Sequence, residues 1–380
     1  MLVTRSALRI AWGTDALDRL PGELRRLGVR KPMLLHASEL TGSPLLGKVH
    51  TDTEPVVTFG EVVAHTPIDS VLAAAELAAA HGVDGLVALG GGSVAVTSRA
   101  VAIASGEDGD LRSLATHRDD AGRVVSPRLS KPKMPIVVLP TTPSTAYGKV
   151  GTAVTVPGSA ERLALFDPKT RAASLVVSAD ALATAPGDLV RNAGLTTMVM
   201  AAEGMTTRKA NMFSDADLGQ ALSILVQDLA AARKNNTASD DGQSPRVRVA
   251  LAALLVGSGT DLTGGGLTAA LSHTLGHTVS RHNGLIDAVV LPHVLAHMGH
   301  AAPERLTGLA KVLDCRVTEL AGVTSDIFAR LSAPSRLGDL GVLVDVLPAI
   351  AEDAMNDFAV QTSGCEANSG ILRSILEAAW

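Results

Sequence analysis

The part of the chain with the clearest capacity for chemistry is a histidine-rich stretch, residues 273–300. Six of the eleven histidines lie there. His273 and His277 are four residues apart, a spacing that places both imidazoles on one face of a helix, about one turn apart. Such a pair either binds a metal ion or lines a pocket and exchanges protons near neutral pH. The choice between these two roles largely decides the mechanism.

A second candidate site is the glycine run Gly90, Gly91 and Gly92 with Ser93, which follows the apolar segment 85–89. Glycine lets the backbone approach a phosphate closely, and a helix that starts there offers N–H groups and positive potential. The run is either a pyrophosphate-binding loop or an ordinary tight turn. Its place between a buried strand and a helix favours pyrophosphate binding.

A third segment carries Thr141, Thr142 and Thr145 directly after the apolar run 135–139. Hydroxyl groups at the carboxyl edge of a parallel sheet are suited to hydrogen bonding with phosphate or ribose. An ordinary capped turn has the same composition, and the spacing alone does not separate the two interpretations.

The composition excludes several classes of protein. The 380 residues are long enough for two domains, and 46% hydrophobic with 19% charged residues indicates a globular chain. Aromatic residues make up only 2% and the net charge is −5. Both values argue against stacking on nucleic-acid bases and against binding to an anionic membrane. We therefore expect a small-molecule substrate, with neither nucleic acid nor membrane as a partner.

The expected compartment is the reduced cytoplasm. Cys315 and Cys365 are too far apart in sequence for a CxxC motif. The N-terminus lacks a secretory hydrophobic region. The longest stretch without Asp, Glu, Lys or Arg, residues 262–280, contains two histidines and several glycines, and we interpret it as a buried core helix and not a membrane span.

The first half of the sequence alternates strand-like with helix-like segments. Strands are predicted over 31–36, 55–63, 85–89 and 135–139, and helices over 70–81 and 94–105. This alternation indicates a parallel sheet covered by helices on both faces. Residues 105–132 are predicted to form a surface loop, and residues 149–177 a short β-rich insert.

From about residue 181 the patterns are helical. The predicted helices cover 187–208, 215–232, 246–257, 267–280 and 287–300, with more toward the C-terminus. The predicted fold is an α/β dinucleotide-binding domain over residues 1–180, joined to an all-α substrate and catalytic domain over residues 181–380. By default we expect a ligand between two such domains.

Taken together, these motifs resemble the iron-containing alcohol dehydrogenase superfamily, which includes maleylacetate reductases. The matching segments are GGGS at 90–93, PTT-x-x-T within 139–145, H-x-x-x-H at 273–277, LPH at 291–293 and the final segment 368–380. They follow the family's order along nearly the whole chain. The resemblance implies a dehydroquinate synthase-like fold, an NAD(H) or NADP(H) cofactor, hydride transfer and a homodimer, since relatives often form dimers.

The metal site of that family is degenerate here. The resemblance places Thr196 and Met200 where the family has an Asp and a His, His273 at its second His, and Asn283 at its third. A thioether and an amide do not replace His and Asp for Fe²⁺ or Zn²⁺. His282, next to Asn283, is an alternative ligand. We nevertheless expect an enzyme without metal, because maleylacetate reductases also look metal-independent.

The resemblance also implies roles on the substrate side. His273 and His277 would polarise a substrate carbonyl or deliver a proton as hydride arrives, unless both are merely core histidines. The residues expected to line the substrate are Tyr147, Thr196, Met200, His282 and Asn283. For Tyr147, at the end of the threonine loop, the alternatives are contact with nicotinamide or substrate, or simple packing.

The remaining cofactor contacts are expected around the first predicted strand. Ala37 stands where many relatives have an Asp that binds the adenosine ribose, and Ser38 follows it. Without a carboxylate to repel a 2′-phosphate, NADP(H) should be tolerated beside NAD(H). Arg162 stands where the family often has a Lys near the cofactor.

The leading hypothesis is a metal-independent, NAD(P)-dependent oxidoreductase that acts on a carbonyl, an alcohol or an activated enoate, as maleylacetate reductase-like enzymes do. A second hypothesis is a tailoring dehydrogenase of natural-product or modified-peptide biosynthesis, because the altered metal positions suggest divergence from simple alcohols. A third is a cofactor-binding protein that has lost catalysis. The sequence leaves the substrate and the direction of the reaction open.

Overall fold

The computed structural model describes residues 7–13, 15–120, 123–158, 162–234, 243–279 and 281–380, and the side chain of His277 lies outside the described part. The chain divides into two compact units. Unit 1 consists of Met1–Ala185 with Thr237–Ala250, and unit 2 consists of Pro186–Asn236 with Leu251–Trp380. Each unit is described by itself.

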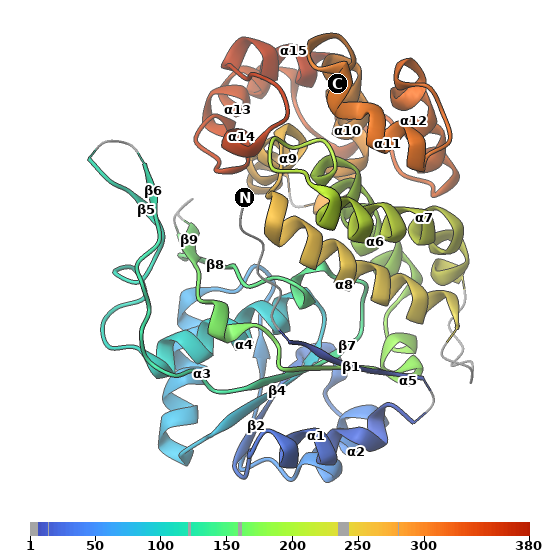
Figure 1. Ribbon diagram of the computed structural model, residues 1–380. Helices are drawn as coiled ribbons and strands as arrows, with labels where there is room; N and C mark the ends of the chain where they lie inside the picture. Colours follow the sequence, from blue (N-terminus) through green and yellow to red (C-terminus); the bar gives the residue numbers. More distant parts are fainter. Residues whose placement is uncertain (1–6, 14, 121–122, 159–161, 235–242, 280) are drawn as a thin grey trace. The chain divides into compact units, whose positions relative to one another are not determined.

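Unit 1 is built on a six-stranded parallel sheet with the strand order β1-β10-β7-β4-β2-β3 (Figure 1). Its strands are β1 (Arg9–Trp12), β2 (Pro32–Ala37), β3 (Val57–Val62), β4 (Gly85–Gly90), β7 (Ile136–Pro140) and β10 (Ser174–Val177). The central strands β4, β7 and β10 are buried along their whole length. Their near-continuous apolar sequences fit strands covered on both faces. The predicted parallel sheet is thus confirmed.

Helices follow these strands along the chain. They are α1 (Leu20–Arg26), α2 (Pro44–Thr53), α3 (Ile68–His81), α4 (Gly92–Gly106) and α5 (Ala179–Ala183). Side chains of α1 and α2 form one core cluster with every second residue of the central strands, among them Leu34, Val87 and Val137. The period of two arises because successive strand residues point to opposite faces of the sheet.

Two short antiparallel pairs extend from unit 1. The predicted β-rich insert contains one of them, β8 (Thr152–Thr155) with β9 (Arg162–Leu165). The predicted surface loop 105–132 contains the other, β5 (His117–Arg118) with β6 (Val124–Val125), whose four residues are exposed (Figure 1). The interpretation of residues 149–177 as one insert was wrong at its end, because β10 is a buried strand of the main sheet between β1 and β7.

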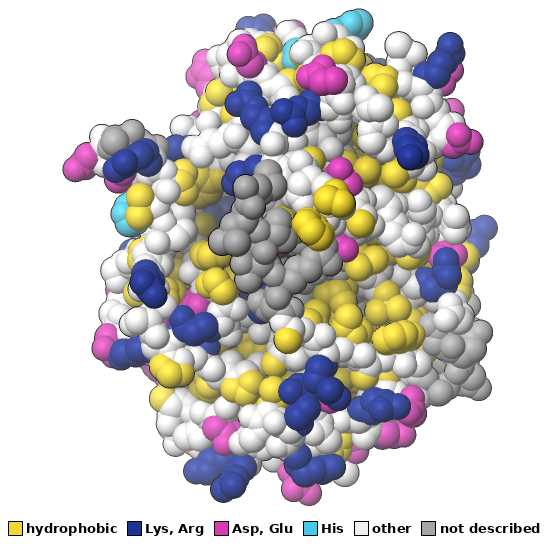
Figure 2. Space-filling view, viewed as in Figure 1, with side chains coloured by type: hydrophobic (Ala, Val, Ile, Leu, Met, Phe, Trp, Pro, Cys, Tyr) yellow, Lys and Arg dark blue, Asp and Glu magenta, His cyan; other side chains and the backbone are white. Residues whose placement is uncertain are grey.

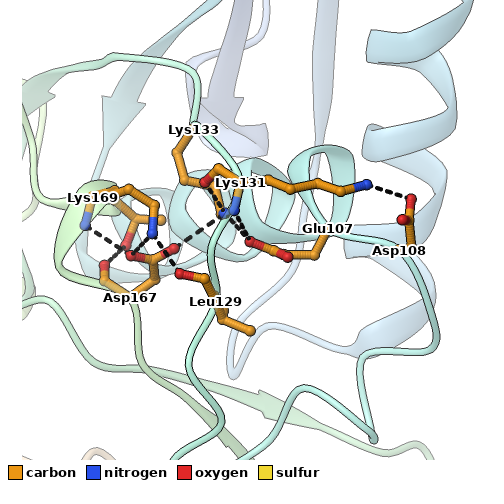
Figure 3. A network of polar contacts seen from close by, with 8 residues as sticks. Glu107, Asp108, Leu129, Lys131, Lys133, Asp167 and Lys169 are labelled. Carbon is orange, nitrogen blue, oxygen red and sulfur yellow. Dashed lines mark hydrogen bonds and ion pairs between the residues drawn. The ribbon is translucent and has the colours of Figure 1, made fainter.

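A buried lysine anchors the loop 105–132 (Figure 3). The Lys133 side chain is fully buried, and its Nζ donates to Glu107 Oε1 at 2.5 Å and pairs with Asp167 Oδ2 at 3.1 Å. Lys169 pairs with the other oxygen of Asp167 and donates to the carbonyl of Leu129. The hydrogen bond from Lys133 holds the pKa of Glu107 below its ordinary value. Both ends of the loop are therefore tied to the turn that precedes β10.

Unit 2 is helical, as predicted (Figure 1). Its helices include α6 (Gly187–Gly204), α7 (Met212–Lys234), α9 (Leu267–Thr278), α10 (Asn283–Ala301), α11 (Thr307–Val312), α12 (Leu320–Arg330), α13 (Leu347–Ala354), α14 (Ala359–Thr362) and α15 (Ser369–Ala379). Glycines allow α6 to pack closely. A Cβ atom at Gly194 would lie 2.3 Å from Leu229 Cδ1 of α7, and one at Gly284 would lie 2.0 Å from the carbonyl oxygen of Asn192. The start of α10 therefore lies against the backbone of α6.

The helix α8 (Pro245–Thr263) has residues in both units. We expected its first residues in the second domain, yet residues 243–250 group with unit 1. Arg246 explains this grouping, because its buried Nη1 donates to the carbonyls of Leu182 at 2.6 Å and Ala185 at 2.8 Å. These two carbonyls lie at the end of α5, where a helix leaves acceptors without intrahelical partners.

Among the described residues, no single helix is long and apolar enough to cross a membrane, while α8 and Leu267–Gly276 of α9 meet that test only as a pair bent by 108°.

Candidate functional site

In unit 1 the candidate site lies at the carboxyl edge of the sheet. The neighbouring strands β2, β4 and β7 are parallel, so the segments that follow them emerge at the same edge. The chain reverses its direction across the sheet at β2, since β3 is added on one side of it and β4 on the other. Ligands of open α/β sheets bind at such a switch point.

The glycine run occupies this switch point. Gly90 has a φ of +155°, and a Cβ atom there would lie 2.4 Å from Val94 Cγ2. A Cβ atom at Gly92 would lie 2.6 Å from Ser144 Oγ. The backbone path therefore requires glycine at Gly90, and at Gly92 a side chain would displace the Ser144 hydroxyl. Helix α4 starts at Gly92, so its first N–H groups lack intrahelical acceptors and can receive a phosphate.

The threonine loop lies against the glycine run. A Cβ atom at Gly91 would lie 3.1 Å from Thr142 Oγ1, and the amide of Thr141 donates to the carbonyl of Gly90 at 3.1 Å. The side chains of Thr141, Thr142 and Thr145 are all buried, whereas Ser93 is half-buried. The structure thus brings together the two loops that sequence analysis singled out separately.

Tyr147 links the two loops. Its hydroxyl lies 3.1 Å from the carbonyl oxygen of Gly90 and 2.9 Å from that of Thr142, and donates to them. The side chain is 1% exposed, and this burial raises the pKa of Tyr147, which keeps the hydroxyl neutral. These contacts favour the packing role for Tyr147 over contact with nicotinamide or substrate.

The other predicted cofactor residues divide into two groups. Ala37, half-buried, ends β2 beside the glycine run, its Cβ 3.2 Å from the place that a Cβ of Gly90 would take, and the exposed Ser38 follows it. Arg162 is exposed in the β8–β9 hairpin, opposite Thr155, and is not part of the strand-end loops. Its cofactor role stays a prediction.

In unit 2 the candidate site is built around α9, which carries His273. The buried carboxyl of Glu203, in the last turn of α6, accepts hydrogen bonds from three amides at the start of α9: Gly266 at 2.9 Å, Thr268 at 2.6 Å and Ala269 at 3.1 Å. Burial raises the pKa of Glu203, and these N–H groups oppose the rise. Glu203 therefore caps α9 from a neighbouring helix and fixes where His273 lies.

His273 forms a pair with Asp357. Its Nδ1 lies 2.8 Å from Asp357 Oδ2, and the side chains are 40% and 23% exposed, respectively. Nε2 makes no hydrogen bond to any residue that the structure describes. Sequence analysis missed Asp357, which is 84 residues further along the chain. No local spacing or motif points to it.

The remaining predicted residues of this part lie at the end of α9, at the start of α10 or on α6. His277 is in α9, but its side chain is outside the described residues, so its role stays a prediction. His282 is exposed at the N-cap of α10, and Asn283 begins that helix half-buried. A Cβ atom at Gly276 would lie 3.0 Å from Asn283 Oδ1, so α9 and α10 are in close contact there.

A second polar pair joins α6 to α10. Thr196 Oγ1 donates to Asp287 Oδ2 at 2.8 Å, and Met200 lies one turn further along α6, half-buried. Asp287 is 5% exposed, and burial raises its pKa to about 6. Sequence analysis also missed Asp287. A signal existed, because it is the sole Asp, Glu, Lys or Arg in the stretch 282–303.

These side chains do not match the donor set of an iron or zinc site. At the four positions, Thr196 offers a hydroxyl, Met200 a thioether and Asn283 an amide, and Nδ1 of His273 is engaged by Asp357. Divalent ions of this kind require charged oxygen, imidazole or thiolate. Within the described part of the chain, no three His, Cys, Asp or Glu residues lie together as a potential metal site.

Comparison with known families agrees with this fold. Residues 7–179 match the family described as iron-containing alcohol dehydrogenase, and residues 191–380 match the C-terminal part of the Fe-containing alcohol dehydrogenase family. The chain belongs to the iron-containing alcohol dehydrogenase family, which confirms the predicted resemblance. It is an enzyme of the dehydrogenase and reductase type.

Individual relatives cover almost the whole chain. The lactaldehyde reductase of Escherichia coli strain K12 is 26% identical, over 97% of this chain and 97% of its own. The maleylacetate reductase of Rhizobium sp. strain MTP-10005 is 27% identical, over 92% of this chain and 89% of its own. The crystal structure of maleylacetate reductase from the same strain superposes with a TM-score of 0.82 at 25% identity, covering 100% of this chain and 97% of that one.

Proposed function

We propose that this enzyme transfers hydride between NAD(H) or NADP(H) and either the carbonyl carbon of a small aldehyde or keto acid or the carbon of an activated enoate, without a bound metal ion. The observation that carries the proposal is the chemistry of the family's four ligand positions. One imidazole, that of His273, remains there beside a hydroxyl, a thioether and an amide. A protein group must then handle the charge that develops on the substrate oxygen.

The strand-end loops of unit 1 support a nicotinamide cofactor. Gly91, Gly92 and Ser93, at the start of α4, would receive the pyrophosphate, and Ala37 would lie near the adenosine ribose. When bound, the cofactor supplies or accepts the hydride. The absence of an acidic side chain at Ala37 and Ser38 supports binding of both NADH and NADPH.

His273 is the proposed proton donor in unit 2. As hydride reaches the carbonyl carbon, the oxygen takes a proton from Nε2 of His273, and the reverse reaction returns it. Thr196, Met200 and Asn283 would contact the substrate beside it, and His277 and His282 remain candidates for the same role. The names of two relatives, lactaldehyde reductase and maleylacetate reductase, indicate the substrate classes to test first.

The surface argues against a polyanionic partner such as nucleic acid. On the face drawn in Figure 2, basic and acidic side chains are interspersed. The net charge of the chain is −5. A protein that binds nucleic acid or an anionic membrane instead concentrates Lys and Arg on one surface.

The first test combines elemental analysis for iron and zinc with fluorescence titrations of NADH and NADPH, before and after dialysis against EDTA. We expect less than stoichiometric metal, cofactor affinities unchanged by EDTA, and NAD(P)H oxidation with lactaldehyde or maleylacetate. Stoichiometric iron or zinc, together with loss of activity on chelation, would contradict the metal-free mechanism. Cofactor binding without turnover on aldehydes, keto acids and larger alcohols would favour a protein that has lost catalysis.

The second test is His273→Gln, with His300→Gln at the exposed end of α10 as its control. Loss of a general acid typically lowers the rate by about 10²- to 10⁴-fold. We expect a fall of that order in kcat for His273→Gln, with an unchanged Kd for NADH, and no change for His300→Gln. Full activity in His273→Gln would refute the assigned role.

A further inference from the structure

We propose that Asp357 is a positioning residue that fixes the orientation and the tautomer of His273. The proposal rests on the proposed function, because it matters for catalysis only if His273 exchanges a proton with the substrate. Asp357 touches neither substrate nor cofactor in this role. It acts through the imidazole, whose other nitrogen is left for the reaction.

Both oxygens of Asp357 have defined partners. Oδ1 accepts a hydrogen bond from the amide of Ala359 at 2.8 Å, and Oδ2 lies 2.8 Å from Nδ1 of His273. An ionised carboxylate only accepts hydrogen bonds, so Nδ1 must carry the proton. The lone pair of a neutral imidazole is then on Nε2, which makes no hydrogen bond to a described residue.

The backbone that carries Asp357 is tied to α9 at a second place. Thr362, at the end of α14, donates from Oγ1 to the carbonyl of Gly265 at 2.7 Å, just before α9 begins. A Cβ atom at Gly265 would lie 3.4 Å from Ala359 Cβ. The segment that directly follows Asp357 is therefore held against the start of the helix that carries His273, which makes the pair a preorganised arrangement.

In the proposed reduction, hydride brings two electrons to the carbonyl carbon and forms the new C–H bond. The π electrons of the carbonyl move to oxygen, which forms an O–H bond with the proton that Nε2 carries in the doubly protonated form of His273. The Nε2–H bond breaks and leaves the neutral imidazole. Throughout this step Nδ1 keeps its proton and its hydrogen bond to Asp357. The carboxylate thereby stabilises the charged imidazole and keeps Nε2 aimed in one direction.

The decisive variant is Asp357→Asn, since the structure determines how the amide must lie. The amide of Ala359 needs an oxygen as acceptor, so the NH₂ group of the new side chain must face Nδ1 of His273. Nδ1 then has to accept, and the proton moves to Nε2. We expect kcat to fall by about 10²-fold, the lower end for a mispositioned general acid or base, with an unchanged Kd for NADH.

The tautomer itself can be measured on the whole enzyme with ¹⁵N-labelled histidine. The signals of His273 are assigned by their loss in His273→Gln. We expect a protonated Nδ1 in the native enzyme and an unprotonated Nδ1 in Asp357→Asn. An unprotonated Nδ1 in the native enzyme would overturn the proposal even if the variant does not fold.

Two further variants distinguish the positioning of His273 from the hydrogen bond to the amide of Ala359 and from a general effect of removing a negative charge. Asp357→Ser keeps an oxygen acceptor for Ala359 but loses the partner of His273, so its kcat should also fall. Asp353→Asn removes the same charge from an exposed site on α13 and should retain full activity. If both Asp357 variants are active and His273→Gln is inactive, the positioning role is refuted and the proposed function stands. A fully active His273→Gln refutes the proposed function itself.

Discussion

At the scale of single residues, we expect the side chain at position 37 to determine the preference between NADH and NADPH. We expect Ala37→Asp to weaken NADPH binding by about tenfold or more, roughly 1.4 kcal/mol, because a carboxylate there would repel the 2′-phosphate. NADH binding should be unchanged or tighter. Fluorescence titration of both cofactors measures this, with Ala37→Asn as the neutral variant of equal size. Equal NADPH affinities for the Asp and Asn variants would contradict the assigned place of the ribose.

Asp287 predicts a pH dependence of stability. Burial raises its pKa to about 6 from 3.8, so folding favours the protonated carboxyl. The stability that this preference contributes is complete below the unfolded pKa and is lost as pH rises through the folded pKa. By linkage, the ionised group costs roughly 3 kcal/mol above pH 6.

Asp287→Asn should therefore be more stable than the native enzyme at pH 8 and should lose most of this advantage by pH 4.5, since an amide oxygen still accepts from Thr196. Urea unfolding at the two pH values measures the difference. If the difference in the free energy of unfolding between the two proteins is the same at both pH values, Asp287 has an ordinary pKa.

The residue scale also shows where sequence analysis ends. The glycine and threonine loops could be predicted, because a local motif follows each buried strand. Asp357 could not, since its role depends on a contact 84 residues away in sequence. For Tyr147 the sequence left contact and packing open, and only its two carbonyl partners favour packing.

At the scale of elements, Lys133 should determine how firmly the loop 105–132 is held. Lys133→Met leaves Glu107 and Asp167 without their buried cation. We expect the free energy of unfolding to fall by about 3 kcal/mol. Lys131→Met is the matched control, because the ion pair of Lys131 with Asp108 is on the surface (Figure 3) and should contribute less than about 1 kcal/mol.

Urea unfolding measures the free energy of unfolding of both variants. A loss of stability in Lys133→Met with an unchanged Kd for NADH would show that Lys133 has a structural role. If Lys133→Met and Lys131→Met are equally stable, the buried network does not hold the loop.

Elements with strong local patterns were predicted well. The apolar runs of β2, β4 and β7 and the helices α3 and α4 agree with their predicted ranges to within two residues or so. The misassigned strand, β10, is four residues long and is defined by its neighbours β1 and β7, which are distant in sequence. Strand propensity and hydrophobic period are properties of one segment, whereas the pairing of β10 with β1 and β7 depends on the whole sheet.

At the scale of the whole molecule, cofactor binding should stabilise unit 1 in particular. NADH at about 100 times its Kd adds about 2.7 kcal/mol to the free energy of unfolding of a protein that binds it only when folded. Hydrogen exchange should slow mainly in the segments 90–95 and 141–145. Protection restricted to other parts of the chain would place the cofactor elsewhere.

The order of motifs along the chain predicted the family and the division into an α/β and an all-α part. It did not predict that residues 243–250 belong to the first part. Their place there depends on Arg246 and two carbonyl groups at the end of α5, a tertiary contact without a sequence pattern.

The same contact has a consequence for the newly made chain. A ribosome adds about 5–20 residues per second, so Arg246 emerges several seconds after the carbonyls of Leu182 and Ala185 that it will bind. During that interval the first unit is incomplete, although all six of its strands have already been made. The second unit must in turn begin with α6 and α7 before the first is closed. Biosynthesis thus interleaves the two units, and a fragment that stops at residue 185 would lack a piece of its own fold.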